Sequence, residues 1–356
     1  MAVLNDEQAM LRDMAREWVD NEAPVAAFRR LRDSGSREGC DPAAWREIAA
    51  MGWAGIVVPE ELGGSAFGYL SLGLVLEQMG RNLVAAPLAT TAVAATAIAE
   101  GGSDAVKQAW LPKIAAGEVI ATLAIDEGPI HDRVFAATTV RDGKLSGVKA
   151  FVAEGDGAGL FVVAAADGLY LVEGEAGGVT RAPRRMVDAR SHAEVRFDGA
   201  PCERLGDADL TERVCDLAAA ATAAEMLGMA VQAFETTNAY LKQRVQFGQP
   251  LSTFQALQHR MARMFTELEL MRSAVEAALE AIDARRSDLA EAVSLAKAIA
   301  GNTLHLVSRE MIQLHGGIGM TDEHDAGLYL KRAQVLETMW GSAAWHRERF
   351  ARINGY

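Results

Sequence analysis

The sequence predicts an α+β protein that is mainly helical, with a small β-module between two helical parts. Three observations lead to this prediction: helical patterns at both ends, a central run of short strand-like segments, and a seven-residue apolar repeat towards the C-terminus. We therefore expect an N-terminal helical domain (1–118), a β-sandwich or barrel (119–205) and a C-terminal four-helix bundle (206–356). A chain of 356 residues is long enough for such a multi-domain fold.

The N-terminal part is predicted to be a series of helices with short breaks. Asn5 is a candidate N-cap, because apolar residues follow it at helical spacing. Further helices are expected at 43–51 and 70–79, joined by a turn-rich connector at 52–64. Pro112 has no N–H to donate, so we expect it at the start or at a kinked end of a helix.

The central part predicts short strands separated by Gly, Asp and Pro. Asp142 and Gly143 form the dipeptide typical of a two-residue hairpin, so strands are expected on both sides of it. The other candidates are short apolar segments of the same kind, which is typical of a sandwich or barrel. The expected strands are 119–125, 138–141, 145–148, 160–164, 169–172 and 193–197.

The C-terminal part predicts long helices that pack against one another. Apolar residues are spaced alternately three and four apart from Phe254 to Ile282, a repeat held for about four heptads. Helices of this kind pack at a shallow angle, as in a four-helix bundle. Besides the helix that carries the repeat, the expected helices are 216–241, 288–314 and 323–353.

The composition argues against several classes of function. A net charge of −13 disfavours sequence-independent binding of nucleic acid. Cys40, Cys202 and Cys215 form no CxxC pair, and the histidines lack metal-binding spacing, so neither a disulfide framework nor a metal site is predicted. We find no signal peptide and no apolar run near the ~20 residues of a membrane span, and therefore expect a soluble, cytoplasmic protein without a membrane partner.

Two short motifs carry the strongest chemical signal. The segment RVQFGQ begins at Arg244 and places a permanent cation beside the ring of Phe247. The segment QLHGGIGM begins at Gln313 and places two glycines, Gly316 and Gly317, beside an amide. A guanidinium suits a pyrophosphate, a ring can stack on a planar group, and bare backbone allows close approach. The two motifs together therefore suggest a flavin.

The order of helices, β-module and bundle, with RxQFG and QxxGGxG, resembles the acyl-CoA dehydrogenase family. Segments 52–64, 110–118 and 147–151 also fit family positions, so the resemblance covers essentially the whole chain. It implies FAD as cofactor, an acyl-CoA substrate desaturated between Cα and Cβ, and an electron-transferring flavoprotein as electron acceptor. In the family each flavin is held by two subunits, by the β-domain of one and the bundle of its neighbour.

This resemblance implies roles for the two motifs. Arg244 would reach the pyrophosphate of the cofactor in a partner subunit, Phe247 would pack on that cofactor, and the second motif would line its adenosine side. Two simpler interpretations stay open: a surface cation at a helix end, and a glycine C-cap with its turn. The cofactor-binding candidates are Arg244, Phe247, Gln313, Gly316, Gly317 and Ser342.

The catalytic base is missing from both positions at which the resemblance expects it. The usual glutamate precedes a Gly-Thr or Gly-Ser pair, but here Trp340 does, and an indole cannot accept a proton. The alternative position, on a bundle helix, holds Ala218. Glu337 would share a helix face with Trp340 if the helix persists, and Glu225 is a second weak candidate. Both glutamates are more simply explained as structural or solvated, so the catalytic residue is left unassigned.

The β-module also departs from the family pattern. Asp126 replaces the threonine of a Thr-Glu-Pro segment, no Gly-Ser-Asp follows it, and Ala153 replaces a threonine expected near the flavin N5. A carboxylate at Asp126 would repel a reduced flavin. Features that serve the chain's own flavin are therefore weakened, whereas features lent to a neighbour remain.

This asymmetry predicts a subunit that works with a homologous partner. The chain is similar to the base-lacking subunits of heterotetrameric acyl-CoA dehydrogenases of steroid side-chain degradation, and segment 329–333 resembles theirs. Two alternatives stay open. One is a self-sufficient homotetramer with an unusual base such as Glu337, and the other is a non-redox scaffold that binds acyl-CoA or protein.

Overall fold

The computed structural model describes residues 4–36 and 39–356. The chain divides into two compact units, and the division passes through helices α4 (Gly68–Arg81) and α7 (Ala208–Gln243). The mainly helical α+β class is confirmed, whereas the domain boundaries predicted at 118 and 205 stay a prediction. Unit 1 comprises Met1–Val25, Gly73–Val84 and Ala219–Tyr356, and unit 2 comprises Ala26–Leu72 and Ala85–Ala218.

Unit 2 combines short helices with a β-sandwich. Asp41 caps the helix at Pro42–Ala50 by accepting a hydrogen bond from the Ala43 N–H at 2.8 Å. Pro112 lies in the last turn of its helix, near the helix end as expected. The helices are α2 (Val25–Ser34), α3 (Pro42–Ala50), α5 (Leu88–Gly101) and α6 (Asp104–Ala115), with 3-10 turns η1 (Trp53–Gly55) and η2 (Glu60–Leu62).

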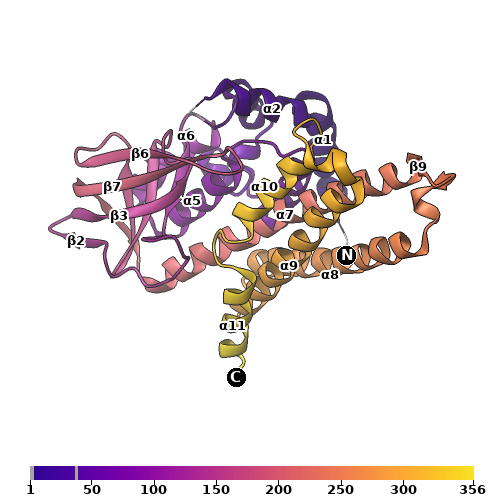
Figure 1. Cartoon of the computed structure of the whole chain (residues 1–356). Helices are drawn as coiled ribbons and strands as arrows, with labels where there is room; N and C mark the ends of the chain where they lie inside the picture. Colours follow the sequence, from indigo (N-terminus) through magenta and orange to yellow (C-terminus); the bar gives the residue numbers. More distant parts are fainter. Residues whose placement is uncertain (1–3, 37–38) are drawn as a thin grey trace. The chain divides into compact units, whose positions relative to one another are not determined.

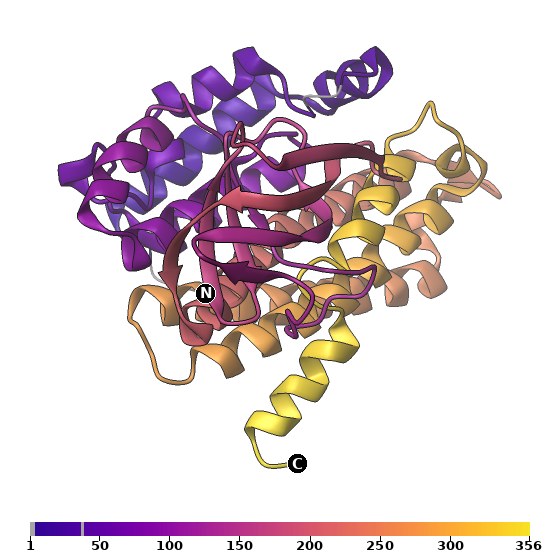
Figure 2. The ribbon, with the colours of Figure 1, turned by 90° about the vertical axis from the view of Figure 1, so that its left-hand side faces the viewer.

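The sandwich consists of two four-stranded sheets, ordered β1-β4-β5-β8 and β2-β3-β7-β6 (Figure 2). Only β1 and β4 pair in parallel. Phe161 of β4 and Phe197 of β7 meet edge to face at 5.9 Å inside a shared apolar core, so of the two predicted alternatives, sandwich or barrel, the structure has the sandwich. The strands are β1 (Ala121–Ala124), β2 (Thr139–Arg141), β3 (Lys144–Ala153), β4 (Leu160–Ala165), β5 (Gly168–Glu173), β6 (Val179–Arg185), β7 (Ser191–Pro201) and β8 (Glu203–Gly206).

Turn chemistry explains both a correct and a missed prediction in these sheets. Asp142 and Gly143 have φ angles of 50° and 70°, as a two-residue hairpin between β2 and β3 requires. Strands β6 and β8 were not predicted, because most of their side chains are exposed and their sequences lack apolar alternation. Strand β6 instead pairs with β7 along its whole length.

Unit 1 is built from long helices (Figure 1). The predicted N-cap is confirmed, since Asn5 and Gln8 form a reciprocal capping box at the start of the first helix. Near the other end of the chain, α9 packs against α8, α10 and α11. The elements are α1 (Asp6–Glu22), α8 (Gln255–Asp283), α9 (Leu289–His315), α10 (Ala326–Leu336) and α11 (Ala343–Ile353), with a hairpin of β9 (Val245–Gln246) and β10 (Gln249–Pro250), η3 (Leu251–Thr253) and η4 (Gly316–Met320).

The apolar repeat forms core, as its spacing predicts. From Met264 to Ile282 its members on α8 are buried. Helix α7 approaches α4 closely through glycine, because a Cβ on Gly228 would lie 1.8 Å from the Glu77 carbonyl oxygen. The predicted bundle consists of α7, α8 and α9, with α10 and α11 together in the fourth position.

The helix predicted at 323–353 is wrong as a single element. Helix α10 ends at Leu336 and α11 starts at Ala343. Trp340 and Gly341 between them have φ angles of 57° and 101°, which a helix does not allow. Glu337 therefore does not share a helix face with Trp340.

Helix α7 corrects the expectation that no apolar run approaches a membrane span. An 18-residue window of α7 has a mean hydropathy of 1.5, enough by length and composition to cross a bilayer. In the structure 89% of that window is buried, as in the core helix of a globular fold. Hydropathy alone does not distinguish a membrane-spanning helix from a buried core helix, whereas the burial of α7 in the structure does.

Candidate functional site

The RVQFGQ motif forms the end of α7 and a two-residue hairpin. The pairing of β9 with β10 leaves Phe247 and Gly248 at the turn, with φ angles of 55° and 81°. Arg244, just before the hairpin, is exposed, and its guanidinium makes no hydrogen bond or ion pair within residues 4–36 and 39–356. All five of its N–H donors are thus available to an external anion.

Phe247 is held outward at the hairpin turn. Its side chain is 89% exposed, and its ring meets Phe254 only edge to face at 6.1 Å. A positive φ is unfavourable for a bulky residue, and the exposed ring offsets none of that cost by burial within this unit. The ring of Phe247 is therefore available for contact with another molecule.

The QLHGGIGM motif forms the end of α9 and the turn that follows it. Gln313, Gly316 and Gly317 are exposed. Gly316 has a φ of 64°, so its glycine is required by the backbone. Gly317 has no positive φ, and a Cβ there would have no neighbour within 4 Å. The chain itself therefore gives no steric reason for the second glycine, which fits close approach by an external group.

The structure brings the two motifs together within unit 1. Tyr240, one turn before Arg244, contacts His315, which directly precedes Gly316. We call Arg244, Phe247, Gln313, Gly316 and Gly317 the trans surface, because the resemblance places them against the cofactor of a partner. A free cation, an uncovered ring and an open glycine turn fit an anionic, planar group such as FAD.

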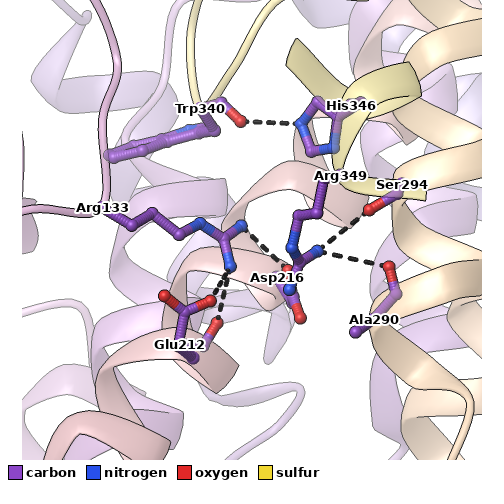
Figure 3. A network of polar contacts seen from close by, with 8 residues as sticks. All are labelled: Arg133, Glu212, Asp216, Ala290, Ser294, Trp340, His346 and Arg349. Carbon is purple, nitrogen blue, oxygen red and sulfur yellow. Dashed lines mark hydrogen bonds and ion pairs between the residues drawn. The ribbon is translucent and has the colours of Figure 1, made fainter. Parts of the chain in front are cut away.

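Trp340, at the position where the resemblance expects the base, is held in place by contacts within unit 1. Trp340 is 5% exposed, and His346 donates from Nε2 to its carbonyl oxygen at 2.9 Å (Figure 3). Beneath the same loop, Lys297 is fully buried and donates from Nζ to the carbonyls of Leu336 at 3.0 Å and Gly341 at 2.9 Å. Burial lowers the pKa of Lys297 to about 7. This loop presents an indole, not a carboxylate.

The other candidates for a base also have structural partners. Glu337 is paired with His305 at 3.0 Å and with Arg309 at 3.3 Å, and Glu225 binds Arg332 through both carboxylate oxygens. Ala218 is buried and has no ionisable group. Neither glutamate is thus a free proton acceptor.

Ser342 has a structural role in this chain. Its hydroxyl caps α11 by accepting a hydrogen bond from the Trp345 N–H at 3.2 Å. Helix α11 is also bound to α9, because Arg349 donates to the Ala290 carbonyl and to the Ser294 hydroxyl (Figure 3). The cofactor role suggested for Ser342 stays a prediction beside this explanation.

In unit 2, the loop between β1 and β2 contains residues that the sequence did not single out. Arg133 lies between two carboxylates of α7, bonded to Glu212 and, at 2.9 Å, to Asp216 (Figure 3). The side chains of Arg133 and Asp216 are 6% and 5% exposed. The sequence shows that the two carboxylates lie one helical turn apart, and this spacing is a signal of a shared partner. It does not show the partner, because Arg133 is 79 residues away from Glu212. The ion pair holds the loop against the start of α7.

Asp126 and Glu127 of this loop also have partners within unit 2. Asp126 binds His131 at 2.7 Å, and Glu127 accepts hydrogen bonds from the backbone of Ala137 and Thr138. Burial would raise the pKa of Glu127, but these bonds and the charge of Lys149 leave it below the usual value. Burial lowers the pKa of Lys149 itself to about 8. The side chains of Asp126, Glu127 and Lys149 are therefore bound to partners within unit 2.

The chain matches two profiles of one family. Residues 5–118 match the acyl-CoA dehydrogenase N-terminal domain, and residues 210–354 match the C-terminal domain. Acyl-CoA dehydrogenase IpdE2 of Mycolicibacterium smegmatis is 32% identical over 98% of both chains. Acyl-CoA dehydrogenase FadE34 of Mycobacterium tuberculosis is 35% identical over 98% of this chain and 48% of its own length, so this chain spans about half of that relative.

Solved structures support the same assignment. The steroid ACAD named Tcur3481-Tcur3483, in a G363A variant, has a TM-score of 0.93 and 32% identity over 98% of both chains. The ChsE4-ChsE5 complex from Mycobacterium tuberculosis has a TM-score of 0.92 and 25% identity over 100% of both chains. By sequence and by fold, this chain belongs to the acyl-CoA dehydrogenase family of flavoprotein oxidoreductases.

Proposed function

We propose that this chain is a subunit of an FAD-dependent acyl-CoA dehydrogenase and lends the trans surface to a homologous subunit that carries the catalytic base. One observation carries the proposal. The groups expected to bind a neighbour's cofactor are exposed and unpaired, whereas Trp340 and Ala218 replace the base at both of its expected positions. A chain that binds the cofactor but has no catalytic base requires another subunit to supply that base.

The trans surface supplies binding, and the partner supplies the chemistry. Arg244 would bind the pyrophosphate, Gln313 and the glycine turn would line the adenosine side, and Phe247 would pack on the cofactor. A bound FAD would supply the acceptor for the β-hydrogen of the acyl thioester, which leaves as a hydride. The role of these side chains is to hold and orient the cofactor in the partner's site.

The β1–β2 loop supports a role without a flavin site of its own. Asp126, Glu127 and Arg133 have partners within unit 2, and Arg133 is anchored by two carboxylates. Opening the loop for a cofactor would break the bonds of Arg133 to Glu212 and to the buried carboxylate of Asp216, and the loss of such charge-assisted bonds is costly. The expected stoichiometry is therefore one FAD for each pair of unlike chains.

The relatives support the choice of partner and substrate class. Two similar structures carry the names of two different chains each, ChsE4-ChsE5 and Tcur3481-Tcur3483, and the second is called a steroid ACAD. We therefore propose a heterotetramer that acts on the CoA thioester of a bulky, steroid-derived acyl group. A cytoplasmic location and transfer of electrons to an electron-transferring flavoprotein belong to the same proposal, as does the three-domain division at 118 and 205.

Expression with and without a partner tests the proposal. The chain would be purified alone and together with a homologous subunit that retains the glutamate, and the visible flavin spectrum would be recorded for each. We expect little flavin in the chain alone and about one FAD per two chains in the complex. Full flavin content in the chain alone would favour a self-sufficient homotetramer, and no flavin in either preparation would favour a non-redox scaffold.

A further inference from the structure

The two halves of the trans surface are connected by stacked aromatic rings in unit 1. Tyr240 lies one turn before Arg244 on α7, and His315 ends α9 directly before Gly316. Their ring centroids are 4.3 Å apart with planes tilted by 30°, and the Tyr240 hydroxyl donates to the His315 carbonyl at 3.3 Å. His324 also stacks on His315, at 4.3 Å.

Backbone contacts extend this stack into both binding segments. The Arg244 N–H donates to the Tyr240 carbonyl at 2.8 Å, and the Leu251 N–H closes the hairpin by donating to the Arg244 carbonyl at 2.8 Å. On the other side, a Cβ on Gly319 would lie 3.1 Å from the Cβ of His315, so the glycine turn is folded tightly around that residue. A shift of either ring would therefore move Arg244 relative to the glycine turn.

The imidazole of His315 is held as a neutral, stacked ring. Its Nδ1 lies 2.7 Å from the Met311 carbonyl and must donate to it, which leaves Nε2 without a proton in the neutral form. Nε2 is buried without a hydrogen-bond partner in the described part of the chain. Burial lowers the pKa of His315, opposed by the Met311 bond and reinforced by His324. The ring thus acts through its shape and contacts and not through charge.

We propose that Tyr240 and His315 are positioning residues that set the spacing between the Arg244 guanidinium and the Gly316–Gly317 turn. The pyrophosphate and the adenosine side of a dinucleotide are covalently linked over a limited distance, so the two segments must be correctly spaced to bind both at once. This inference rests on the proposed function, because the dinucleotide is that of the partner subunit. Tyr240 acts through Arg244 and His315 acts through the glycine turn, without touching the cofactor.

A double-mutant cycle on the heteromeric complex tests the inference. The rate of FAD release after dilution would be followed by flavin fluorescence for Arg244→Ala, Tyr240→Leu and the double variant. Arg244→Ala should speed release by roughly 10- to 100-fold, since it removes a charge-assisted bond. Tyr240→Leu should speed release by about tenfold, and the double variant should release FAD no faster than Arg244→Ala alone, because Tyr240 acts through Arg244.

Conservative variants keep the test independent of folding. Tyr240→Phe and His315→Phe retain a ring, so they should release FAD within about threefold of the wild-type rate, whereas His315→Ala should resemble Tyr240→Leu. Additive effects of the Tyr240 and Arg244 substitutions, or unchanged release from Tyr240→Leu, would overturn the positioning role. Unchanged release from Arg244→Ala would instead overturn the trans surface itself, and that outcome is distinct.

Discussion

The trans surface and the β1–β2 loop differ in where their polar partners lie. On the trans surface, Arg244 and Gln313 have no side-chain partner in residues 4–36 and 39–356, and the ring of Phe247 is 89% exposed. In the loop, Arg133 is bound by two carboxylates and Glu127 accepts bonds from two backbone N–H groups. Under the proposed function, the first region binds an external partner, whereas Arg133 and Glu127 of the second are bound within unit 2.

Under the proposed function, the difference explains how one family fold can lose half of a site and keep the other half. A polar group that no longer meets a cofactor is stable in a buried position only if the protein supplies a partner. Arg133 has such partners in Glu212 and Asp216. The buried Lys297 has them in two backbone carbonyls beside Trp340. Arg244, by contrast, is exposed to water and needs no such partner within the chain.

The largest expected effect is the loss of stability when the loop is opened. Arg133→Met removes the cation that lies between two carboxylates, and one of them, Asp216, is only 5% exposed. Breaking a buried pair costs ~3–5 kcal/mol, and we expect the lower end because Glu212 is 46% exposed. Urea unfolding of the wild-type and variant chains measures the difference.

The exposed pair of Arg352 and Glu348 provides the control. Both side chains are more than 70% exposed, at 73% and 77%, so Arg352→Ala should cost less than about 0.5 kcal/mol. If Arg133→Met were as mild as this control, the loop would not depend on its ion pair. The contrast between a closed loop and an open trans surface would then fail.

The next largest expected effect is weaker FAD binding when the trans surface loses its cation. Arg244→Ala should weaken retention of FAD by the heteromeric complex by ~1.5–3 kcal/mol, because a charge-assisted bond to pyrophosphate is lost. Lys242→Ala is a matched control, since Lys242 is an exposed cation in the last turn of the same helix. The dissociation constant of FAD, measured by flavin fluorescence, should rise for the first variant only. Equal values for both would mean that Arg244 is an ordinary surface cation.

Sequence reasoning was most successful where the signal is local. The Asp142–Gly143 hairpin, the Asn5 cap and the apolar repeat on α8 depend on nearby residues, and all three are confirmed. The exposed strand β6 and the break before α11 were missed, because pairing with β7 and the left-handed backbone at Trp340 are decided by tertiary structure.

The same limit applies to the candidate site. The residues of the trans surface could be named because they form two contiguous motifs, and their cofactor role stays a prediction. Arg133 and Lys297 could not be named, since their partners are far away in the sequence and include backbone carbonyls. The contact of Tyr240 with His315 likewise joins residues 75 positions apart. Sequence motifs can indicate candidate ligand-binding residues. The contacts that hold such residues in place join distant parts of the sequence, so they are found only in the structure.

A smaller effect separates the two glycines of the turn. Gly316→Ala should destabilise the chain by about 1 kcal/mol, because an L-residue is strained at a φ of 64°. Gly317→Ala should leave stability unchanged, because its Cβ would have no neighbour within 4 Å. The same Gly317 variant should release FAD faster if the cofactor approaches this backbone. Thermal unfolding and FAD release measure the two effects, and a Gly317 variant that is normal in both would remove this glycine from the trans surface.

The smallest expected effect would sharpen the comparison most, because stability and binding should move in opposite directions. Phe247→Asn places in the turn a residue that tolerates a φ of 55°, and the lost ring is 89% exposed. We expect the isolated chain to become more stable by about 0.5 kcal/mol in urea unfolding, because backbone strain is relieved without loss of core packing. FAD release from the heteromeric complex should become several-fold faster. A loss of stability near the ~3–5 kcal/mol typical of a deleted core aromatic would show that the ring is packed within its own chain, and the reason to regard this hairpin as a surface for a partner would disappear.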